Sequence, residues 1–393
     1  MRVPGRFGSG SRAIGRREAL GRIAGGLLAP GVLLSGCTGE GAGSRQGDGP
    51  MLGPLPPVLL DPSRIRRSYV CLRPFRPSGM RLEVEHVAGR RVVHNYGHGA
   101  GGVTLSWGTA TMAADMLRAD GVSAETEVAV VGCGVVGLST ALVLLGRGAR
   151  VTIYTRDLPL DTTSSMAAAN FYPSYVADPS AETPAFLDRI ERACRISHRM
   201  FLERLPQARY GIRWRRQFFL TDEWNEEIEA GSEIYRRLRD LYPDAQEYGP
   251  SRHPFSTRHA FVEDNLFIEP PLYLMALLED VRQAGGRIEM RTLSGPEDLH
   301  ALPESVVMHC TGLGARDLAG DPEVRGLTGQ HVFLEPQPEV EYAASLNGRG
   351  TPYVFPRSDG ILLGLGEGEV VTPAEMVERC RALVPAAGGG STP

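Results

Sequence analysis

The stretch over residues 127–154 constrains the fold most, because it reads as a strand, a glycine-rich turn, a helix and a second strand in direct succession. Residues 128–131 are an apolar run of strand type. The turn GCGVVG at 132–137 has the form G-x-G-x-x-G, and an apolar helical stretch follows it. A second strand is expected at 150–154. This order predicts a βαβ unit of a doubly wound α/β fold with a dinucleotide site at its first turn.

Each glycine of this turn has a mechanical role. Gly132 permits the tight turn, Gly134 lets the backbone approach a pyrophosphate, and Gly137 lets the helix pack close to the strand. The pyrophosphate is expected at the helix N-terminus, where the free amides of Val135 and Val136 and the helix dipole favour an anion.

Two polar features follow the second strand. Asp157, with Arg156 beside it, stands where the acid that holds a nucleotide ribose is expected. The run Thr162-Thr163-Ser164 offers hydroxyl groups for contacts to phosphate or ring. On the residues alone, an ordinary helix cap explains this run equally well.

The basic residues exclude two kinds of cofactor chemistry. All 42 are arginines, because the chain contains no lysine. A Walker-type phosphate loop and pyridoxal-phosphate catalysis both need a lysine, so neither is possible. The net charge of −4 leaves no basic stripe, and nucleic acid is not expected as a partner. The six cysteines lack zinc spacing, so we expect no metal site.

The first 37 residues resemble an export signal. Arg16 and Arg17 precede an apolar run at 23–36 that is too short to span a bilayer, as in twin-arginine signals. The run ends in LSGC, which resembles a lipobox with Cys37 as the acylated residue. We therefore expect a signal peptide at 1–37 and a lipid-anchored protein of the bacterial cell envelope. A buried first helix is the alternative, and its glycines and prolines disfavour it.

The segment HNYGHGAGGVTLSWG at 94–108 resembles the signature of the D-amino acid oxidase family. Three further pieces are similar to the family: RDLPLDTTSSMAAANFYP, FIEPPLYLMALLEDVRQAGG and VVMHCTGLGARDLAGDP. The resemblance covers about 66–384. It implies FAD as cofactor, a D-amino acid as substrate, and dioxygen or another electron acceptor as partner.

The order of these pieces departs from the family. There the nucleotide strand opens the chain, and the HNYGH segment lies near its end. Here residues 72–117 precede Gly132, and the family's R-P-x-R-P segment appears as RPFRP at 73–77. We interpret this as a circular permutation in which 119–126 join the former ends. Two fused fragments in a chain that folds otherwise are the alternative.

The resemblance implies an α/β (α+β) fold with a doubly wound FAD-binding domain and a mostly antiparallel substrate domain. A flexible linker is expected at 38–60, the permuted oxidase domain at 61–384 and a disordered tail at 385–393. The flavin part would take about 89–178 and 271–325, and the substrate part would take about 61–88, 179–270 and 326–384. Apolar runs predict strands at 211–220, 259–267, 331–335, 353–356 and 360–364, and a helix at 373–383.

The resemblance also assigns catalytic positions. Arg73 matches the arginine that grips the substrate carboxylate, and Tyr353 matches a tyrosine that hydrogen-bonds the same group; a surface arginine and a packing tyrosine are the alternatives. Ala100 stands where the family has a glycine whose carbonyl contacts the substrate amine. Arg349 replaces a tyrosine that covers the substrate, which suggests an acidic or otherwise polar D-amino acid.

The remaining flavin contacts implied by the resemblance are Gly99, Gly101, Gly102, Val103, Thr104, Thr162, Thr163 and Gln330. The expected reaction is oxidative deamination to a 2-oxo acid, with ammonia and hydrogen peroxide. A glycine or other amine oxidase, a quinone-linked dehydrogenase and a flavin-binding lipoprotein without turnover remain alternatives.

Overall fold

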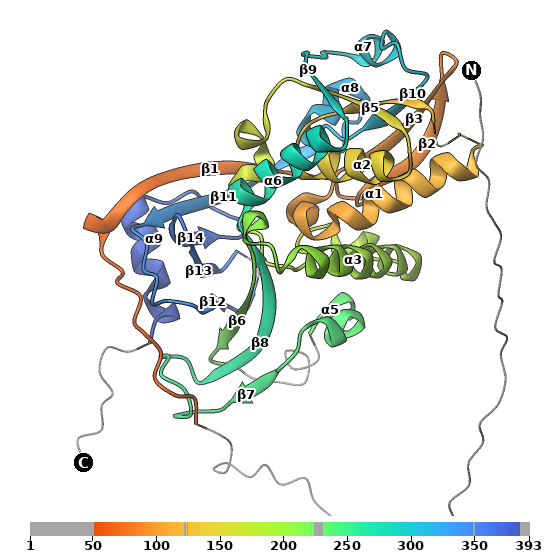
Figure 1. Ribbon diagram of the computed structural model, residues 1–393. Helices are drawn as coiled ribbons and strands as arrows, with labels where there is room; N and C mark the ends of the chain where they lie inside the picture. The colour runs from red at the N-terminus through yellow and green to blue at the C-terminus, as the bar shows by residue number, and fades with distance from the viewer. Residues whose placement is uncertain (1–50, 122, 124, 224–230, 349, 386–393) are drawn as a thin grey trace, which may run out of the picture. The chain divides into compact units, whose positions relative to one another are not determined.

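The computed structural model describes residues 51–121, 123, 125–223, 231–348 and 350–385. The predicted signal peptide with Cys37, Arg349 and nearly all of the predicted tail therefore lie outside the described residues. Two β-sheets and the helices packed on them account for the described part of the chain (Figure 1). Within that part, no helix is both long enough and apolar enough to cross a bilayer.

The six-stranded sheet is built around the predicted βαβ unit. Its order is β2 (Arg81–Val87), β3 (Arg90–Tyr96), β10 (Val306–His309), β4 (Glu127–Val131), β5 (Arg150–Thr155) and β9 (Arg287–Met290). Only β2 pairs antiparallel; the other neighbours are parallel. The predicted strands at 128–131 and 150–154 are thus confirmed. Their apolar runs suit a parallel sheet that is covered on both faces.

Helices cover both faces of this sheet. The longer ones are α1 (Gly102–Ala119), α2 (Val135–Gly146), α3 (Pro184–Arg204) and α6 (Pro270–Gln283); α1 packs on α2 and α3, and α2 packs on α6. Val128 and Val130 of β4 face this layer, whereas Ala129 and Val131 face the opposite one. That opposite face carries α7 (Pro296–His300) and α8 (Ala315–Leu318). The doubly wound arrangement is therefore confirmed. A short α5 (Glu233–Leu238) packs beside α3.

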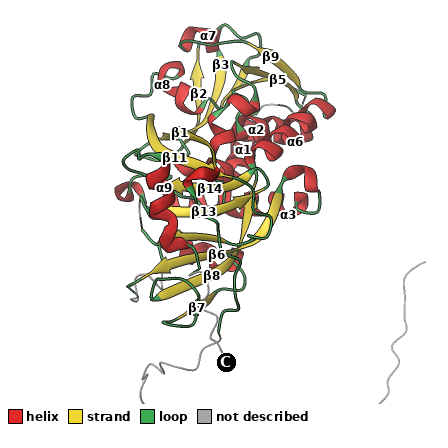
Figure 2. Ribbon diagram, turned by 90° about the vertical axis from the view of Figure 1, so that its left-hand side faces the viewer, coloured by secondary structure: helices red, strands yellow, loops and turns green. Residues whose placement is uncertain are grey.

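The eight-stranded sheet is almost entirely antiparallel. Its order is β1 (Ile65–Phe75), β11 (Arg325–Leu334), β14 (Gly360–Leu365), β13 (Pro352–Arg357), β12 (Ala343–Leu346), β6 (Ile212–Thr221), β8 (His259–Ile268) and β7 (Gln246–Tyr248). Only β12 and β6 are parallel neighbours. Apolar side chains of one face pack with α9 (Pro373–Arg379), which lies on the near side in Figure 2. The other face is left for the cavity described below.

Two boundaries differ from the sequence prediction. Strand β11 begins at Arg325, well before residue 331, because β1 pairs with it along nearly its whole length and holds its glycines in a strand. Strand β2 belongs to the six-stranded sheet, because the turn at Gly89 (φ +74°) folds it back onto β3. Residues 81–87 therefore do not lie in the substrate part, where the sequence division placed them. The other predicted strands, and the helix beginning at 373, are confirmed.

Candidate active site

A cavity of about 920 Å³ lies between the two sheets and collects most of the predicted site residues. Those that line it are Arg73, Gly99, Ala100, Gly102, Val103, Thr104, Gly132, Gly134, Val135, Val136, Arg156, Asp157, Thr162, Thr163, Ser164 and Tyr353. Folding therefore brings the glycine-rich turn, the HNYGH segment and the predicted carboxylate-binding pair to one site, although they are far apart in the chain.

The glycine-rich turn shows the close approaches that its spacing predicts. Gly132 has a φ of +105°, where a side chain would be strained. A Cβ atom at Gly137 would lie 1.9 Å from the carbonyl oxygen of Gly132, so a side chain there would push α2 away from the turn. Val135 and Val136, the first residues of α2, line the cavity. The N-terminus of α2 is thus available to an anionic group.

The polar run Thr162-Thr163-Ser164, which follows β5, contacts the glycine-rich turn. Oγ of Ser164 accepts a hydrogen bond from the backbone N–H of Val135 at 3.0 Å. The hydroxyl of Thr162 donates to the carbonyl of Pro159 at 2.7 Å, and Thr163 begins a 3-10 turn that ends at Met166. The run therefore lines the cavity, and Ser164 satisfies the first amide of α2. Thr162 makes no side-chain cap hydrogen bond to the turn that it precedes.

Arg156 and Asp157 lie just beyond the carboxyl end of β5, where open α/β sheets bind nucleotides. Nη2 of Arg156 is 2.7 Å from Oδ2 of Asp157. The hydroxyl of Thr155 donates to the backbone carbonyl of Asp157 at 2.7 Å and fixes the turn. An acid therefore stands at the cavity wall where a ribose is expected, already paired with a cation.

The HNYGH segment supplies a second wall. Gly99 has a φ of +57°, and a Cβ atom there would lie 1.8 Å from the carbonyl oxygen of Tyr175, so only glycine fits. The turn that contains Ala100 leads into α1, and Ala100 lines the cavity. The hydroxyl of Thr104, in the first turn of α1, donates to the carbonyl of Tyr172 at 3.1 Å. A second helix N-terminus is therefore aimed at the cavity.

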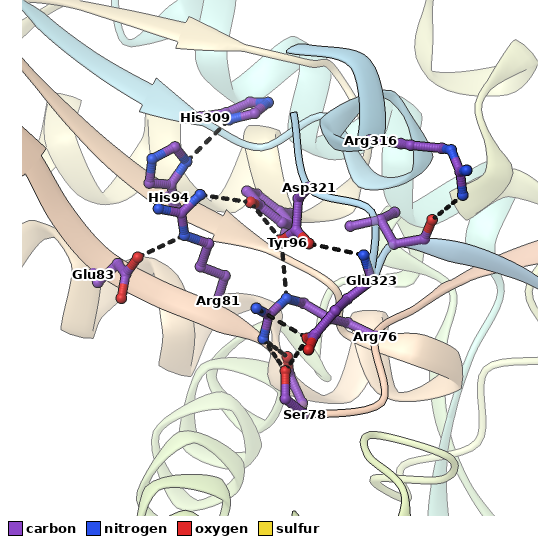
Figure 3. A network of polar contacts seen from close by, with 12 residues as sticks. Arg76, Ser78, Arg81, Glu83, His94, Tyr96, His309, Arg316, Asp321 and Glu323 are labelled. Carbon is purple, nitrogen blue, oxygen red and sulfur yellow. Dashed lines mark hydrogen bonds and ion pairs between the residues drawn. The ribbon is translucent and has the colours of Figure 1, made fainter. Parts of the chain in front are cut away.

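Figure 3 shows the polar network that connects the RPFRP and HNYGH segments with residues that follow β10. Oη of Tyr96 donates to Oδ2 of Asp321 at 2.9 Å, and Nε of Arg76 lies 2.9 Å from the same carboxylate oxygen. His94 and His309 are register partners on neighbouring parallel strands, with their Nδ1 atoms 3.1 Å apart. These contacts hold the RPFRP segment and residues 309–323 to β3, the strand of the six-stranded sheet in which the HNYGH segment begins.

Arg73 lies on β1 against the backbone of β11 and β14. Its guanidinium donates to the carbonyls of Gly366, Leu365 (3.4 Å) and Thr328 (3.5 Å). A Cβ atom at Gly329 would lie only 2.4 Å from Nη2 of Arg73. The planar guanidinium of Arg73 therefore packs directly on the backbone of Gly329. Arg73 is half-buried and faces the cavity.

Tyr353 rests on a second glycine and on a buried histidine. A Cβ atom at Gly364 would lie 2.2 Å from Cζ of Tyr353. Oη of Tyr353 is 2.6 Å from Nε2 of His331, whose side chain is almost fully buried. Burial, followed by the charges of Arg73 and Arg357, lowers the pKa of His331 to about 3. Burial also raises the pKa of Tyr353. The two groups therefore form a neutral, hydrogen-bonded pair beside a cation.

The sequence analysis did not predict a row of residues that runs across the eight-stranded sheet at this end of the cavity. Successive Cα partners across the large sheet are Tyr69, His331, Gly364, Tyr353, Ser345 and Phe219. His331, Ser345 and Phe219 line the cavity, as does Gln217 two residues before Phe219 on β6. The sequence did contain one indication of these positions, namely polar residues on otherwise apolar strands. A polar residue that is buried on such a strand needs a partner.

Some predicted residues are not brought into the cavity. Gln330 is occupied elsewhere: its Nε2 donates to the carbonyl of Val371 at 2.6 Å, and its Oε1 accepts from the N–H of Val371 at 2.9 Å. Strand alternation turns Gln330 to the face opposite His331, and Gln330 is not among the residues that line the cavity. Gly101 and Gly137 stand behind the cavity wall and serve close packing. Arg349 lies outside the described residues.

The donor set fits FAD. The cavity runs from the glycine-rich turn to the Arg73–Tyr353 pair, and two helix N-termini with bare glycine backbone line it. Residues 132–136 and the hydroxyls of 162–164 would hold the pyrophosphate. Residues 99–104 would lie along the remainder of the cofactor.

Comparisons with known proteins identify the family of this chain. The family model for FAD dependent oxidoreductase (DAO) matches residues 127–390. The D-amino-acid oxidase of Streptomyces coelicolor is 32% identical over 285 residues, which cover 67% of this chain and 80% of that protein. The D-amino-acid oxidase of Rubrobacter xylanophilus is 32% identical over 271 residues, covering 65% of this chain and 76% of that protein.

Among solved structures, glycine oxidase from Bacillus cereus matches with a TM-score of 0.49 and 16% identity, covering 67% of this chain and 79% of that one. The family match extends over most of the chain and includes the predicted dinucleotide turn. The chain therefore belongs to the DAO family of FAD-dependent oxidoreductases, with FAD as its cofactor.

Proposed function

We propose that this protein oxidises a D-amino acid to the 2-oxo acid, with release of ammonia and hydrogen peroxide. One observation carries the proposal: Arg73 on β1, His331 on β11 and Tyr353 on β13 lie within four successive strands, at one end of the cavity whose other walls suit FAD. A guanidinium and a phenol side by side form a site for a carboxylate. The two relatives described above are named D-amino-acid oxidases, which supports the same substrate class.

The side chains would bind and orient the substrate. Three of the five N–H groups of Arg73 donate to backbone carbonyls, which leaves two for the carboxylate. The Tyr353 hydroxyl would give a third contact that fixes the rotation of the carboxylate. His331 holds the phenol in place through the 2.6 Å hydrogen bond. When bound, FAD would supply the hydride-accepting chemistry for the C–H bond that these residues orient. The substrate amine binds neutral, so no side chain has to remove a proton, and water hydrolyses the imine product.

The test is an absorption spectrum of the FAD-loaded protein without air, before and after addition of D- or L-amino acids. Loss of the flavin absorbance near 450 nm with D-enantiomers only is the expected result. Bleaching by glycine or secondary amines alone would replace this proposal with an amine oxidase. FAD that no amine bleaches would indicate a binding protein without turnover. Peroxide release in air separates an oxidase from a quinone-linked dehydrogenase.

We also propose that the fold is a circular permutation of the family arrangement. The family match begins at residue 127, and the RPFRP and HNYGH segments precede it. Helix α9 lies against the turn Pro62–Arg64 that leads into β1, so the end of the described chain neighbours the start of β1. A gene that encodes 127–385 followed by a short linker and 61–118 should give a protein that binds FAD and bleaches like the original. A product that is soluble but binds no FAD would contradict the permutation.

We propose a lipid anchor at Cys37 and a location at the bacterial cell envelope, reached by the twin-arginine route. The support is the residue pattern alone: Arg16 and Arg17, the apolar run and the LSGC sequence. In a bacterial host, the Cys37→Ser variant should move from the membrane fraction to the soluble fraction, and mass spectrometry should find diacylglycerol on Cys37 of the original. Membrane association that survives the substitution would refute the anchor.

A further inference from the structure

Tyr175 lines the cavity in an unusual backbone conformation. Its φ is +50°, in the left-handed region that a bulky residue rarely adopts. A Cβ atom at Gly99 would lie 1.8 Å from the carbonyl oxygen of Tyr175, so the backbone of Tyr175 packs directly on the HNYGH segment. Strain of this kind persists only where the surrounding structure imposes it, and it is concentrated at functional sites.

The phenol of Tyr175 reaches from this wall of the cavity to the eight-stranded sheet. Its Oη accepts a hydrogen bond from the backbone N–H of Gly350 at 3.1 Å. A Cβ atom at Gly366 would lie 2.9 Å from the same Oη. The carbonyl of Gly366 in turn accepts a hydrogen bond from the guanidinium of Arg73. The hydroxyl of Tyr175 therefore lies close to the residue that is proposed to bind the substrate carboxylate.

Three side chains lie over three glycines on the cavity side of this sheet: Arg73 over Gly329, Tyr353 over Gly364 and Tyr175 over Gly366. Gln330 pairs with Leu365, so Gly329 and Gly366 come next in the register of β11 and β14. Gly364 and Gly366 are two residues apart, which places the two phenol hydroxyls roughly 7 Å from each other. This spacing leaves room for one carboxylate between the phenols and against the guanidinium.

We propose that Tyr175 is the third side chain of the carboxylate site. Its ring closes the side that Arg73 and Tyr353 leave open and excludes water from the ion pair between Arg73 and the substrate. A charge pair from which water is excluded is stronger, and is screened less by salt, than a pair in solvent. The strained backbone directs the ring across the cavity. This inference rests on the proposed function and adds a substrate-positioning residue to it.

The test is the variant Tyr175→Gly, because glycine adopts a positive φ without strain and the change removes only the side chain. KM for D-amino acids should rise about tenfold or more, since the ion pair then enters solvent. KM of this variant should also rise with NaCl up to roughly 0.5 M, whereas KM of the unmodified protein should change little.

Two further variants show whether the ring is responsible. Tyr175→Phe keeps the ring and should restore most of the lost affinity. Ala88→Gly is the matched control, because Ala88 has the same φ of +50° but is exposed and lies outside the cavity. This control should leave KM and its salt dependence unchanged. If Tyr175→Gly does not fold, Tyr175→Asn takes its place under the same criteria, since asparagine tolerates the left-handed region.

Binding of benzoate, an unreactive carboxylate, gives a measurement that needs no turnover. Its Kd, followed by the change in flavin absorbance of the FAD-loaded protein, should rise in Tyr175→Gly together with KM. Unchanged KM and Kd in a folded, FAD-containing Tyr175→Gly protein would refute the role of Tyr175. Tyr175→Phe that is as impaired as Tyr175→Gly would also refute it. If no D-amino acid bleaches the flavin but benzoate binding still weakens in Tyr175→Gly, the proposed function fails and the role of Tyr175 in carboxylate binding stands.

Discussion

Substitution of Tyr353 by phenylalanine tests the carboxylate site and the buried pair at once. The change removes one oxygen atom and keeps the ring that rests on Gly364. The hydroxyl would lose its contact to a charged carboxylate, which is worth about 1.5–3 kcal/mol. This corresponds to a rise in KM of roughly 10- to 150-fold. Because Arg73 still orients the carboxylate, kcat should fall much less.

The same substitution should also destabilise the folded protein. The Nε2 atom of His331 would lose its partner at 2.6 Å in a position that is 1% exposed. Leaving a buried polar group unpaired costs about 1–3 kcal/mol of unfolding free energy. Urea unfolding measures this loss, and steady-state kinetics with D-amino acids measures KM.

A double-mutant cycle with His331→Leu separates the two effects. If His331 holds the phenol, the two substitutions should be non-additive in KM by about 0.5–1.5 kcal/mol. Full additivity would mean that His331 only fills space. An unchanged KM in Tyr353→Phe would refute the role of the hydroxyl in carboxylate binding, whatever happens to stability.

Further predictions follow from the glycines and the buried histidines. Gly329→Ala should displace the flexible Arg73 guanidinium, since the new Cβ would lie 2.4 Å from Nη2. KM should rise about tenfold or more, with FAD binding kept. Unchanged kinetics would contradict the packing of Arg73 on Gly329. Gly137→Val should abolish FAD binding, because its Cβ would lie 1.9 Å from a backbone oxygen; normal flavin content after purification would contradict this. Burial lowers the pKa of three histidines, to about 4 for His98 and to about 3 for His309 and His331. Below about pH 6.5 these histidines bind protons in the unfolded chain but not in the folded chain. The free energy of unfolding should therefore fall as the pH is lowered from 6.5 toward 3–4. The expected loss is about 1.4 kcal/mol per pH unit for each histidine. A free energy of unfolding that is flat from pH 7 to 5 would contradict their neutrality.

The parts of the site that lie in contiguous residues were predictable from the sequence. The turn at 132–137 and the segment at 94–108 carry their chemistry within a few residues, so their spacing already determines the local backbone. The strands were predictable because apolar runs on a covered sheet are nearly continuous. The start of β11 was not, since its glycines are held in a strand only by pairing with the distant β1.

The parts that depend on register were not predictable. His331, Ser345 and Gln217 lie on three different strands, and only the pairing of those strands brings them to one cavity. Gln330 shows the reverse case: adjacent residues on a strand face opposite sides, and the resemblance does not say which side a residue takes. Its carboxamide contacts the backbone of Val371 instead.

The position of β1 near the start of the chain also determines how long it is without its partner strand during translation. Arg73 and Thr328, which meet on β1 and β11, are 255 residues apart in the chain. At about 5–20 residues per second, a ribosome would deliver the partner strand roughly 10 to 50 seconds after β1 emerges. Until then a long strand with exposed backbone groups waits without its neighbour, which favours aggregation or chaperone capture. The residue proposed to grip the substrate is thus among the first to be synthesised and among the last to reach its final place.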